Sequence, residues 1–337
     1  MAQRFPLPRY PSGWFQVLWS EELEASEVKP LQAFGRELVM FRTESGAVQV
    51  LDAHCPHVGA HLGHGGTVCG ESIRCPFHAW EFDGSGACTK VPYAEKIPAK
   101  AKTRAWPVRE HSGMILVWHD IDDRPPSFEI PEFPEIESEE WSEPEHRTWK
   151  IRSHNQEMGE NVVDSAHFKY LHGMAQQPPA TVELRDHVFF METPTFMTSK
   201  QGDIVGNLTS NSHGYGVATN RFTGFVETLV LGNVTAIDDD YVEIRFTFVV
   251  KKMGGADITR GIGKAFSNEI ARQLEQDIPM WENKVYFESP VLCDGDGPFG
   301  KYRKWGKQFY PEWYRKRAKD LYEAQQQARP EYRPDGA

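Results

Sequence analysis

The chain has 337 residues, enough for two domains with separate cores, which excludes a small scaffold held together by disulfides alone. Acidic residues outnumber basic ones and give a formal net charge of −11, so we do not expect a nucleic-acid partner. No run of residues approaches the roughly 20 apolar residues that cross a bilayer, and the start of the chain does not resemble a secretory signal. We therefore expect a cytoplasmic protein without a membrane span.

The first part of the chain predicts a β-rich domain. Between Trp14 and His119, short apolar stretches alternate with Gly, Pro and Asp at the intervals of small antiparallel sheets, so we place this domain at residues 1–120. Residues 121–145 are rich in Pro and acidic side chains and lack the periodicity of a helix or a strand, which predicts a linker. Residues 146–337 then form the second domain.

The second domain predicts a mixed architecture. Residues 155–173 and 262–287 have helical patterns, and residues 188–252 between them read as hairpin-forming strands. The basic, Gln-rich end from about residue 311 predicts a surface helix with a loose tail. Strands between two helices indicate an α+β fold with a sheet curled around a long helix.

Two short segments carry paired Cys and His residues. Cys55 and His57 are two positions apart, Cys75 and His78 are three apart, and 17 residues separate the pairs. Such ligands on paired loops suit either a tetrahedral zinc ion or a 2Fe-2S cluster in which histidines replace two thiolates. A Pro after each Cys and several nearby glycines, which would let the backbone approach inorganic sulfide, favour the cluster.

The window from His54 to Tyr93 resembles the Rieske iron–sulfur motif, CxH followed by CxxH. The resemblance implies that Cys55, His57, Cys75 and His78 bind a 2Fe-2S cluster, with structural zinc as the alternative. Neutral imidazole makes such a cluster less negative than an all-cysteine one and raises its potential. Cys69 and Cys88 could form a disulfide, but the cytoplasmic assignment favours two free thiols.

A second candidate site lies in ENVVDSAHFKYLH, residues 160–172. His167 and His172 are five residues apart, about 140° on a regular helix, so they can share a metal only if the helix is distorted or ends between them. Gly173 makes an ending plausible. Asp164 lies one turn before His167, within reach of a hydrogen bond to it. Two ordinary helix histidines are the alternative.

The helix predicted at 262–287 offers a third ligand. Its apolar stripe consists of Phe266, Ile270, Leu274, Ile278, Trp281 and Val285. Asp277 falls inside this stripe, and a carboxylate on a core face costs several kcal/mol unless a cation or a hydrogen-bond donor meets it. We expect Pro279 to interrupt the helix just beyond, and Asp277 could instead cap or pair at that break. Two histidines and one carboxylate are the ligand set of oxygen-activating non-haem Fe(II) sites, and iron suits the site better than redox-inert zinc.

Together these features resemble the oxygenase component of the Rieske non-haem iron oxygenases. The resemblance implies a helix-grip (START-like) catalytic domain with His167, His172 and Asp277 as ligands of a mononuclear Fe(II). It also implies a head-to-tail homotrimer in which each cluster lies beside the iron of the neighbouring subunit. In that assembly Asp164 would bridge His78 of one subunit and His167 of the next.

Two stretches, AHFKYLH and the segment from Asp277 to Tyr310, are similar to the steroid-acting branch: the 3-ketosteroid 9-alpha-hydroxylases and cholesterol 7-desaturases. The substrate implied is a small hydrophobic molecule of the steroid class, and the reaction is hydroxylation or, alternatively, desaturation. Strand alternation lets about half of the apolar side chains face such a ligand. The residues that could line the pocket are Phe189, Phe190, Phe222, Phe225, Val230, Phe246 and Phe248.

The chain shows no nicotinamide or flavin fingerprint, so we expect electrons to come from a separate NAD(P)H-dependent reductase or a ferredoxin. Two other classes of protein remain as alternatives. A Rieske electron carrier would need only the first third of the chain, and a sterol-binding module could keep a cluster without any catalytic iron.

Overall fold

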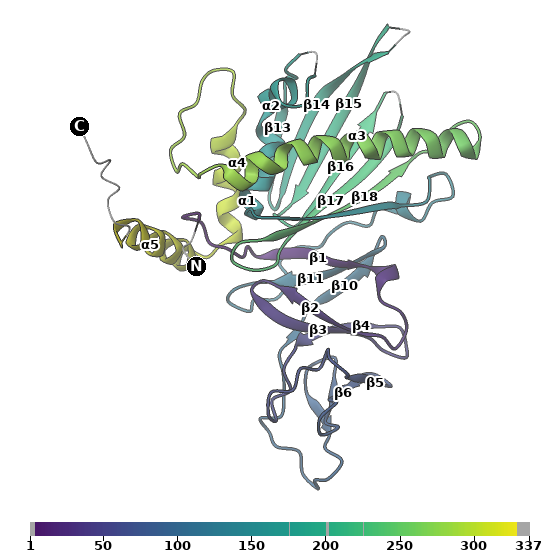
Figure 1. Cartoon of the computed structure of the whole chain (residues 1–337), viewed down its shortest axis with the longest axis vertical. Helices are drawn as coiled ribbons and strands as arrows, with labels where there is room; N and C mark the ends of the chain where they lie inside the picture. Colours follow the sequence, from purple (N-terminus) through teal and green to yellow (C-terminus); the bar gives the residue numbers. More distant parts are fainter. Residues whose placement is uncertain (1–3, 175, 200–201, 225, 329–337) are drawn as a thin grey trace, which may run out of the picture.

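The computed structural model describes residues 4–174, 176–199, 202–224 and 226–328. Figure 1 shows the strands of the first half of the chain below the large sheet of the second half, with a long helix lying across that sheet. The β5–β6 region lies at the opposite end of the molecule from this helix.

The first half of the described chain is built from short antiparallel strands, as predicted. Three small sheets have the orders β1-β11-β10, β2-β3-β4-β9 and β5-β6-β7-β8. The strands are β1 (Gly13–Trp19), β2 (Val28–Ala33), β3 (Arg36–Arg42), β4 (Val48–Asp52), β5 (Thr67–Cys69), β6 (Ser72–Arg74), β7 (Glu81–Asp83), β8 (Cys88–Lys90), β9 (Ala105–Trp106), β10 (Val108–His111) and β11 (Met114–His119), with a short 3-10 helix η1 (Ser20–Glu22).

The sheet of the second half is antiparallel throughout, in the order β12-β18-β17-β16-β15-β14-β13. Its strands are β12 (Glu145–Ile151), β13 (Thr181–Arg185), β14 (Val188–Ser199), β15 (Gly202–His213), β16 (Val217–Thr223), β17 (Thr228–Ala236) and β18 (Val242–Val250). The helices are η2 (Pro134–Ile136), α1 (Asn155–Gly159), η3 (Glu160–Val163), α2 (Ser165–Tyr170), α3 (Ala256–Asn283), α4 (Phe299–Gly306), η4 (Lys307–Phe309) and α5 (Glu312–Ala328). This is the α+β arrangement that the pattern indicated, with α3 across a curved sheet (Figure 1).

Three details differ from the sequence-based expectation. The helical segment predicted at 155–173 is three short pieces, α1, η3 and α2, rather than one helix. Residues 121–145 are largely irregular, as expected, but contain η2 and the first residue of β12. The third detail is the length of α3, which begins at Ala256 and does not stop near Pro279.

Pro279 lies inside α3, so the expected interruption is wrong. A proline in a helix cannot donate to the carbonyl four residues earlier, which here belongs to Glu275. Glu275 and Pro279 are both on the exposed side of the helix, where water can satisfy that carbonyl. The helix therefore continues for another turn and ends at Asn283.

The two faces of the large sheet pack against different partners. Val217, Leu229 and Leu231 form one buried cluster with side chains of β1 and β11, such as Trp14 and Leu116. The alternate residues of the same strands point to the other face, toward α3. One face of the sheet therefore packs against the first half of the chain, and the other face is turned toward α3.

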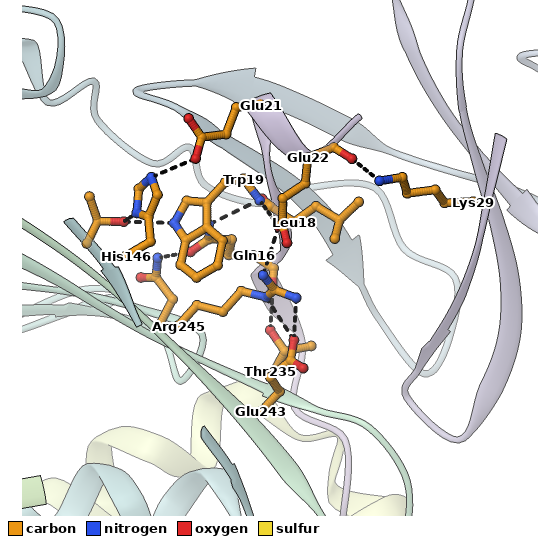
Figure 2. Close-up of polar contacts among 12 residues, drawn as sticks. Gln16, Leu18, Trp19, Glu21, Glu22, Lys29, His146, Thr235, Glu243 and Arg245 are labelled. Carbon is orange, nitrogen blue, oxygen red and sulfur yellow. Dashed lines mark hydrogen bonds and ion pairs between the residues drawn. The ribbon is translucent and has the colours of Figure 1, made fainter. Parts of the chain in front are cut away.

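Polar contacts add to this junction between the halves of the chain (Figure 2). The indole of Trp19 stacks on the imidazole of His146, with ring centroids 4.3 Å apart. Arg245 of β18 lies between two carboxylates, 2.9 Å from Glu22 and 2.8 Å from Glu243. The guanidinium also covers the Trp19 ring, so stacking, cation–π contact and ion pairing fix the orientation of β1 on the sheet.

No helix in the described part of the chain is long and apolar enough to cross a membrane.

Candidate active site

The predicted cluster ligands lie on two loops with matching backbone geometry. In the first loop, the Cys55 N–H donates to Ala60 O and the Gly59 N–H donates to Cys55 O. In the second, Cys75 and Ala79 make the corresponding bonds, to Trp80 O and to Cys75 O. Gly59 and Ala79 occupy equivalent positions and both have positive φ, 82° and 56°. The twenty-residue offset between the loops therefore brings the two cysteines to equivalent positions.

The cysteines and histidines differ in depth. Cys55 and Cys75 are buried in one apolar cluster with Leu51 and Ile73, whereas His57 is exposed. Burial, together with the neighbouring Cys75, raises the pKa of the Cys55 thiol to about 11. The rings of His57 and His78 are 4.6 Å apart between centroids. The thiols thus face the protein and the imidazoles face the surface.

This arrangement fits a 2Fe-2S cluster better than a single ion. Among the described residues, the groups of donor atoms within 4.8 Å of one another do not include the four loop ligands. Four ligands of one tetrahedral zinc, each about 2.0–2.3 Å from it, would lie that close. Gly66 and Gly86 are required by the packing of the protein itself, because Cβ atoms there would come within 2.1 Å of the carbonyl oxygens of Leu62 and Thr103. A Cβ at Gly59 would meet no described heavy atom within 4 Å.

The two remaining cysteines of this region are free, as predicted. Cys69 is on β5 and Cys88 is on β8, at opposite edges of one sheet. Three strand spacings separate them by about 14 Å, well beyond the reach of a disulfide.

The second candidate site depends on where α2 ends. The helix stops at Tyr170, and the N–H of His172 donates to His167 O across five residues. Gly173 then takes a positive φ of 77°. This ending removes the angular separation of a regular helix and brings the rings of His167 and His172 to 4.9 Å between centroids.

Each imidazole is held through the nitrogen that faces away from its neighbour. Nδ1 of His167 is hydrogen-bonded to the backbone carbonyl of Asp164, and Nδ1 of His172 lies 3.1 Å from Oε1 of Gln276. Because both partners are acceptors, a neutral imidazole at each position would carry its proton on Nδ1 and leave the Nε2 lone pair to bind a metal. The Asp164 carboxylate is farther away, 3.8 Å from His167 Nδ1, and about one third exposed.

Asp277 completes the group from α3, and its phase on the helix was predicted correctly. It is 7% exposed, and Oδ1 lies 3.4 Å from His172 Nε2. The donor atoms of His167, His172 and Asp277 all lie within 4.8 Å of one another. The carboxylate has no Lys or Arg partner among the described residues, so a bound cation would compensate its buried charge.

The surroundings shift the pKa values of the two histidines in opposite directions. Burial lowers the pKa of His167, which favours the neutral form that binds metal. Burial alone would also lower the pKa of His172, but hydrogen bonds with Asp277 and Gln276 outweigh it and raise that pKa. The donors suit a mononuclear Fe(II), because two imidazoles and one carboxylate leave positions open.

Sequence reasoning missed two residues that contact these ligands. The Asn161 side-chain amide donates to Asp277 Oδ2 at 3.0 Å and lies 3.4 Å from His167 Nε2. Gln276 holds His172, as described above. The sequence contains an amide six residues before His167 and another beside Asp277, but their roles follow only from the contact between η3 and α3.

A cavity of about 710 Å³ lies between α3 and the large sheet, with the three candidate ligands among its lining residues. On the α3 side its wall is largely apolar: Ile262, Phe266, Ile270, Leu274 and Trp281. Of the seven side chains predicted to line it, three do so: Phe222, Val230 and Phe246. Phe189 packs instead against Tyr302 and Trp305, Phe190 lies against Arg185, Phe248 is buried away from the lining, and Phe225 lies outside the described residues.

Comparison with protein families gives two matches that together cover most of the chain. Residues 13–106 match the Rieske [2Fe-2S] domain. Residues 117–310 match the 3-ketosteroid 9alpha-hydroxylase C-terminal domain.

Similar proteins of known function come from bacteria and animals. The 3-ketosteroid-9-alpha-monooxygenase oxygenase component of Rhodococcus rhodochrous is 31% identical over 325 residues, which cover 90% of this chain and 82% of the relative. The cholesterol 7-desaturase of Caenorhabditis elegans is 33% identical over 349 residues, which cover 93% of this chain and 80% of the relative. The cholesterol 7-desaturase nvd 1 of Ciona intestinalis is 31% identical over 331 residues, which cover 90% of this chain and 70% of the relative.

Solved structures share the fold at lower identity. An NdmA mutant of Pseudomonas putida CBB5 with theobromine superposes with a TM-score of 0.72 at 20% identity, covering 92% of this chain and 93% of that one. Dicamba monooxygenase bound to dicamba superposes with a TM-score of 0.72 at 17% identity, covering 91% of this chain and 98% of that one.

Proposed function

The chain is the oxygenase component of a Rieske non-haem iron monooxygenase, and from this premise we propose that it oxidises an unactivated carbon of a steroid or sterol. The oxidant is dioxygen, and a separate reductase or ferredoxin supplies the electrons. The family uses a 2Fe-2S cluster together with a mononuclear Fe(II). The relatives that are similar over most of the chain act on 3-ketosteroids or cholesterol by name, which supports the same substrate class here.

One observation carries this proposal: the three-residue ligand set lies on the wall of a large apolar cavity. A sterol-binding module would need the cavity but not two histidines and a buried carboxylate within 4.8 Å of one another. An electron carrier would need neither. The combination supports an enzyme that exposes a rigid hydrophobic substrate to a redox-active metal.

We assign the metal ligands on the same basis. Cys55, His57, Cys75 and His78 would hold the cluster, and His167, His172 and Asp277 would hold the iron. When bound, the cluster would deliver electrons one at a time and the iron would supply the chemistry that activates dioxygen. The protein orients both imidazoles, positions the carboxylate through Asn161 and surrounds the substrate with apolar side chains that exclude water.

We also propose that the active assembly is a head-to-tail homotrimer. The two candidate centres lie in regions at opposite ends of one chain (Figure 1). Large apolar side chains are exposed beside the cluster loops, with Val58 and Phe77 60% and 65% exposed. Others are exposed near the iron site, including Tyr170 and Phe287 at 78% and 65%. Two different apolar patches on one chain support a heterologous interface that closes into a ring.

Asp164 is our candidate for the residue that joins the two centres across this interface. Its backbone carbonyl holds the His167 ring and its Oδ1 accepts from the His167 backbone N–H, so Oδ2 of its partly exposed carboxylate remains for His78 of a neighbouring subunit. We predict that Asp164→Asn keeps both metal sites filled and the oligomer intact but lowers turnover by about two orders of magnitude or more. Iron content, visible absorption and single-turnover product yield test this. Full activity in the variant would refute the bridge.

Purified protein with a generic ferredoxin reductase system, NADH and a panel of steroids tests the proposed function. Oxygenation predicts products heavier by one oxygen atom, whereas desaturation predicts products lighter by two hydrogens. Iron analysis should find about three irons per chain, falling to about two in Asp277→Ala while the absorption of the cluster persists. An Asp277→Ala variant that still forms product would overturn the assignment of the iron site.

A further inference from the structure

The sheet side of the cavity contains a pair of polar side chains in a largely apolar surface. Ser210 of β15 and Asn220 of β16 are directly opposite each other in the strand register, and both line the cavity. On the same face, the next pair in one direction is apolar, Leu208 and Phe222, and the next pair in the other direction is Ser212 and Ala218. Cross-strand pairs on one face contact each other, so the two polar side chains form a single feature.

The hydrogen bond between Ser210 and Asn220 leaves the Nδ2 donors of Asn220 without a partner among the described residues. The Ser210 hydroxyl, only 2% exposed, donates to Oδ1 of Asn220. The carboxamide of Asn220 then has two N–H donors on Nδ2, and neither has a hydrogen-bond partner among the described residues. This pair therefore presents donors, rather than acceptors, to whatever occupies the cavity.

Three other polar side chains of the lining have their donors engaged, whereas the buried hydroxyl of Tyr215 also has no partner among the described residues. The Thr193 hydroxyl donates to Pro179 O, and the Asn155 amide donates to Val234 O. Asn161 donates to Asp277. Asn155 keeps an unpaired Oδ1, but this atom is an acceptor. Asn220 thus differs from Thr193, Asn155 and Asn161 in having N–H groups free to bind a ligand.

Asn220 and the candidate metal ligands line the cavity from different elements. Asn220 belongs to β16, whereas Asp277 belongs to α3 and the two histidines belong to α2 and the residues just after it. Phe222, two residues from Asn220 on β16, contacts Phe266 of α3, with ring centroids 5.0 Å apart. Phe266 lies about 16 Å along α3 from Asp277.

We propose that Asn220 determines substrate specificity by donating a hydrogen bond to a ketone oxygen of the steroid. This inference rests on the proposed function and deepens it. An apolar ring system would fill the space between α3 and the sheet, and a ketone would accept from Nδ2. Because the amide and the ligand set line the cavity from different elements, the ketone and the oxidised carbon belong to different parts of the ring system.

Equilibrium dialysis with the iron-loaded full-length protein, without reductant, tests this inference. The probes are androst-4-ene-3,17-dione and two analogues that each lack one carbonyl, androst-4-en-3-one and androst-4-en-17-one. For the wild type we expect one analogue to bind about tenfold more weakly than the dione, because its methylene leaves the buried donors unpaired. For Asn220→Leu this ratio should fall to within about threefold.

Two further variants make the test independent of folding defects. Asn220→Asp has nearly the same shape but replaces the donors by an acceptor, so it should also lose the preference for the dione. Thr193→Val is the matched control, because this side chain lines the same cavity but its hydroxyl is already bound to Pro179. It should keep the wild-type ratio.

Each outcome discriminates. A wild-type preference that disappears in Asn220→Leu and Asn220→Asp, but not in Thr193→Val, supports the inference. A preference that both Asn220 variants retain overturns it, as does a wild type that binds all three probes equally, and both results leave the proposed steroid oxidation standing. A wild type that binds none of the probes and oxidises no steroid in the panel overturns the proposed function as well.

Discussion

The two candidate histidine ligands are oriented by hydrogen bonds at Nδ1, the ring nitrogen that is not expected to bind the iron. His167 is held by a backbone carbonyl one turn earlier on its own segment, whereas His172 is held by the side chain of Gln276, which belongs to α3. A carbonyl acceptor at Nδ1 fixes the tautomer and directs Nε2 toward the metal. The two histidines therefore depend on different parts of the chain for the same purpose.

We predict that Gln276→Ala weakens metal binding without unfolding the protein. Loss of the acceptor lets the His172 ring rotate and change tautomer, which typically costs about tenfold or more in metal affinity. Anaerobic titration with Fe(II), or with Zn(II) as a redox-silent substitute, measures the change. Gln276→Glu keeps an acceptor and should bind metal more tightly than Gln276→Ala.

Gln273→Ala is the control, because Gln273 lies one turn away on α3 and bonds only to the exposed Glu269. It should bind metal like the wild type. Equal affinities for the Gln276→Ala and Gln273→Ala variants would show that Gln276 does not position the ligand.

At the scale of elements, α3 carries both Asp277 and a wall of the cavity, so its C-terminal end must be fixed. Arg4 does this from the other end of the sequence. Its guanidinium donates to Trp281 O at 2.6 Å and to Lys284 O at 2.9 Å, where α3 leaves carbonyls without helical partners. A positive charge at this position also interacts favourably with the helix dipole.

We predict that Arg4→Ala lowers the free energy of unfolding by about 1–2 kcal/mol, because charged hydrogen bonds to the last carbonyls are lost. Urea unfolding followed by circular dichroism measures this. Arg260→Ala removes an exposed ion pair with Asp257 near the start of the same helix and should change stability by less than about 0.5 kcal/mol. If the two variants lose equal stability, Arg4 does not cap α3.

At the scale of the whole molecule, the first half of the chain and α3 pack on opposite faces of the large sheet, and several histidines are buried in the interior. Burial lowers the pKa of His119 to about 4, that of His154 to about 3 and that of His213 to about 4. Each is charged more readily in the unfolded chain, where its pKa is about 6.5. The folded state therefore binds fewer protons, and stability is lost as the pH falls from about 6.5 toward 4.

We predict that the free energy of unfolding is highest above pH 6.5 and falls by up to about 1.4 kcal/mol per pH unit for each such histidine. The buried carboxyl of Glu157 and the imidazole of His172 have raised pKa values and oppose this trend, but the three buried histidines have the larger shifts. Urea unfolding at pH 7.5 and pH 5.0 measures the difference. In His213→Gln the difference should shrink, and an unchanged difference in this variant would contradict the assignment.

The amount that could be predicted differs between the two metal centres. The cluster motif is local: each loop holds its own Cys and His, and the backbone bonds of each loop close within about six residues. Chemistry and short spacing were therefore enough to identify it. For the iron site, the phase of Asp277 on its helix and the end of α2 near Gly173 were both correctly inferred, because helix geometry depends mainly on nearby residues.

The sequence by itself determined the element types, the local motifs and the presence of a polar ligand on an apolar helix face, since these depend on periodicity and short-range geometry. Only the tertiary structure decided that Gln276 supports His172, that Asn161 reaches Asp277 and that Asn220 faces the cavity. Those contacts join residues up to 116 positions apart. Their formation depends on how the sheet curves around α3, a property of packing that no short stretch of sequence contains.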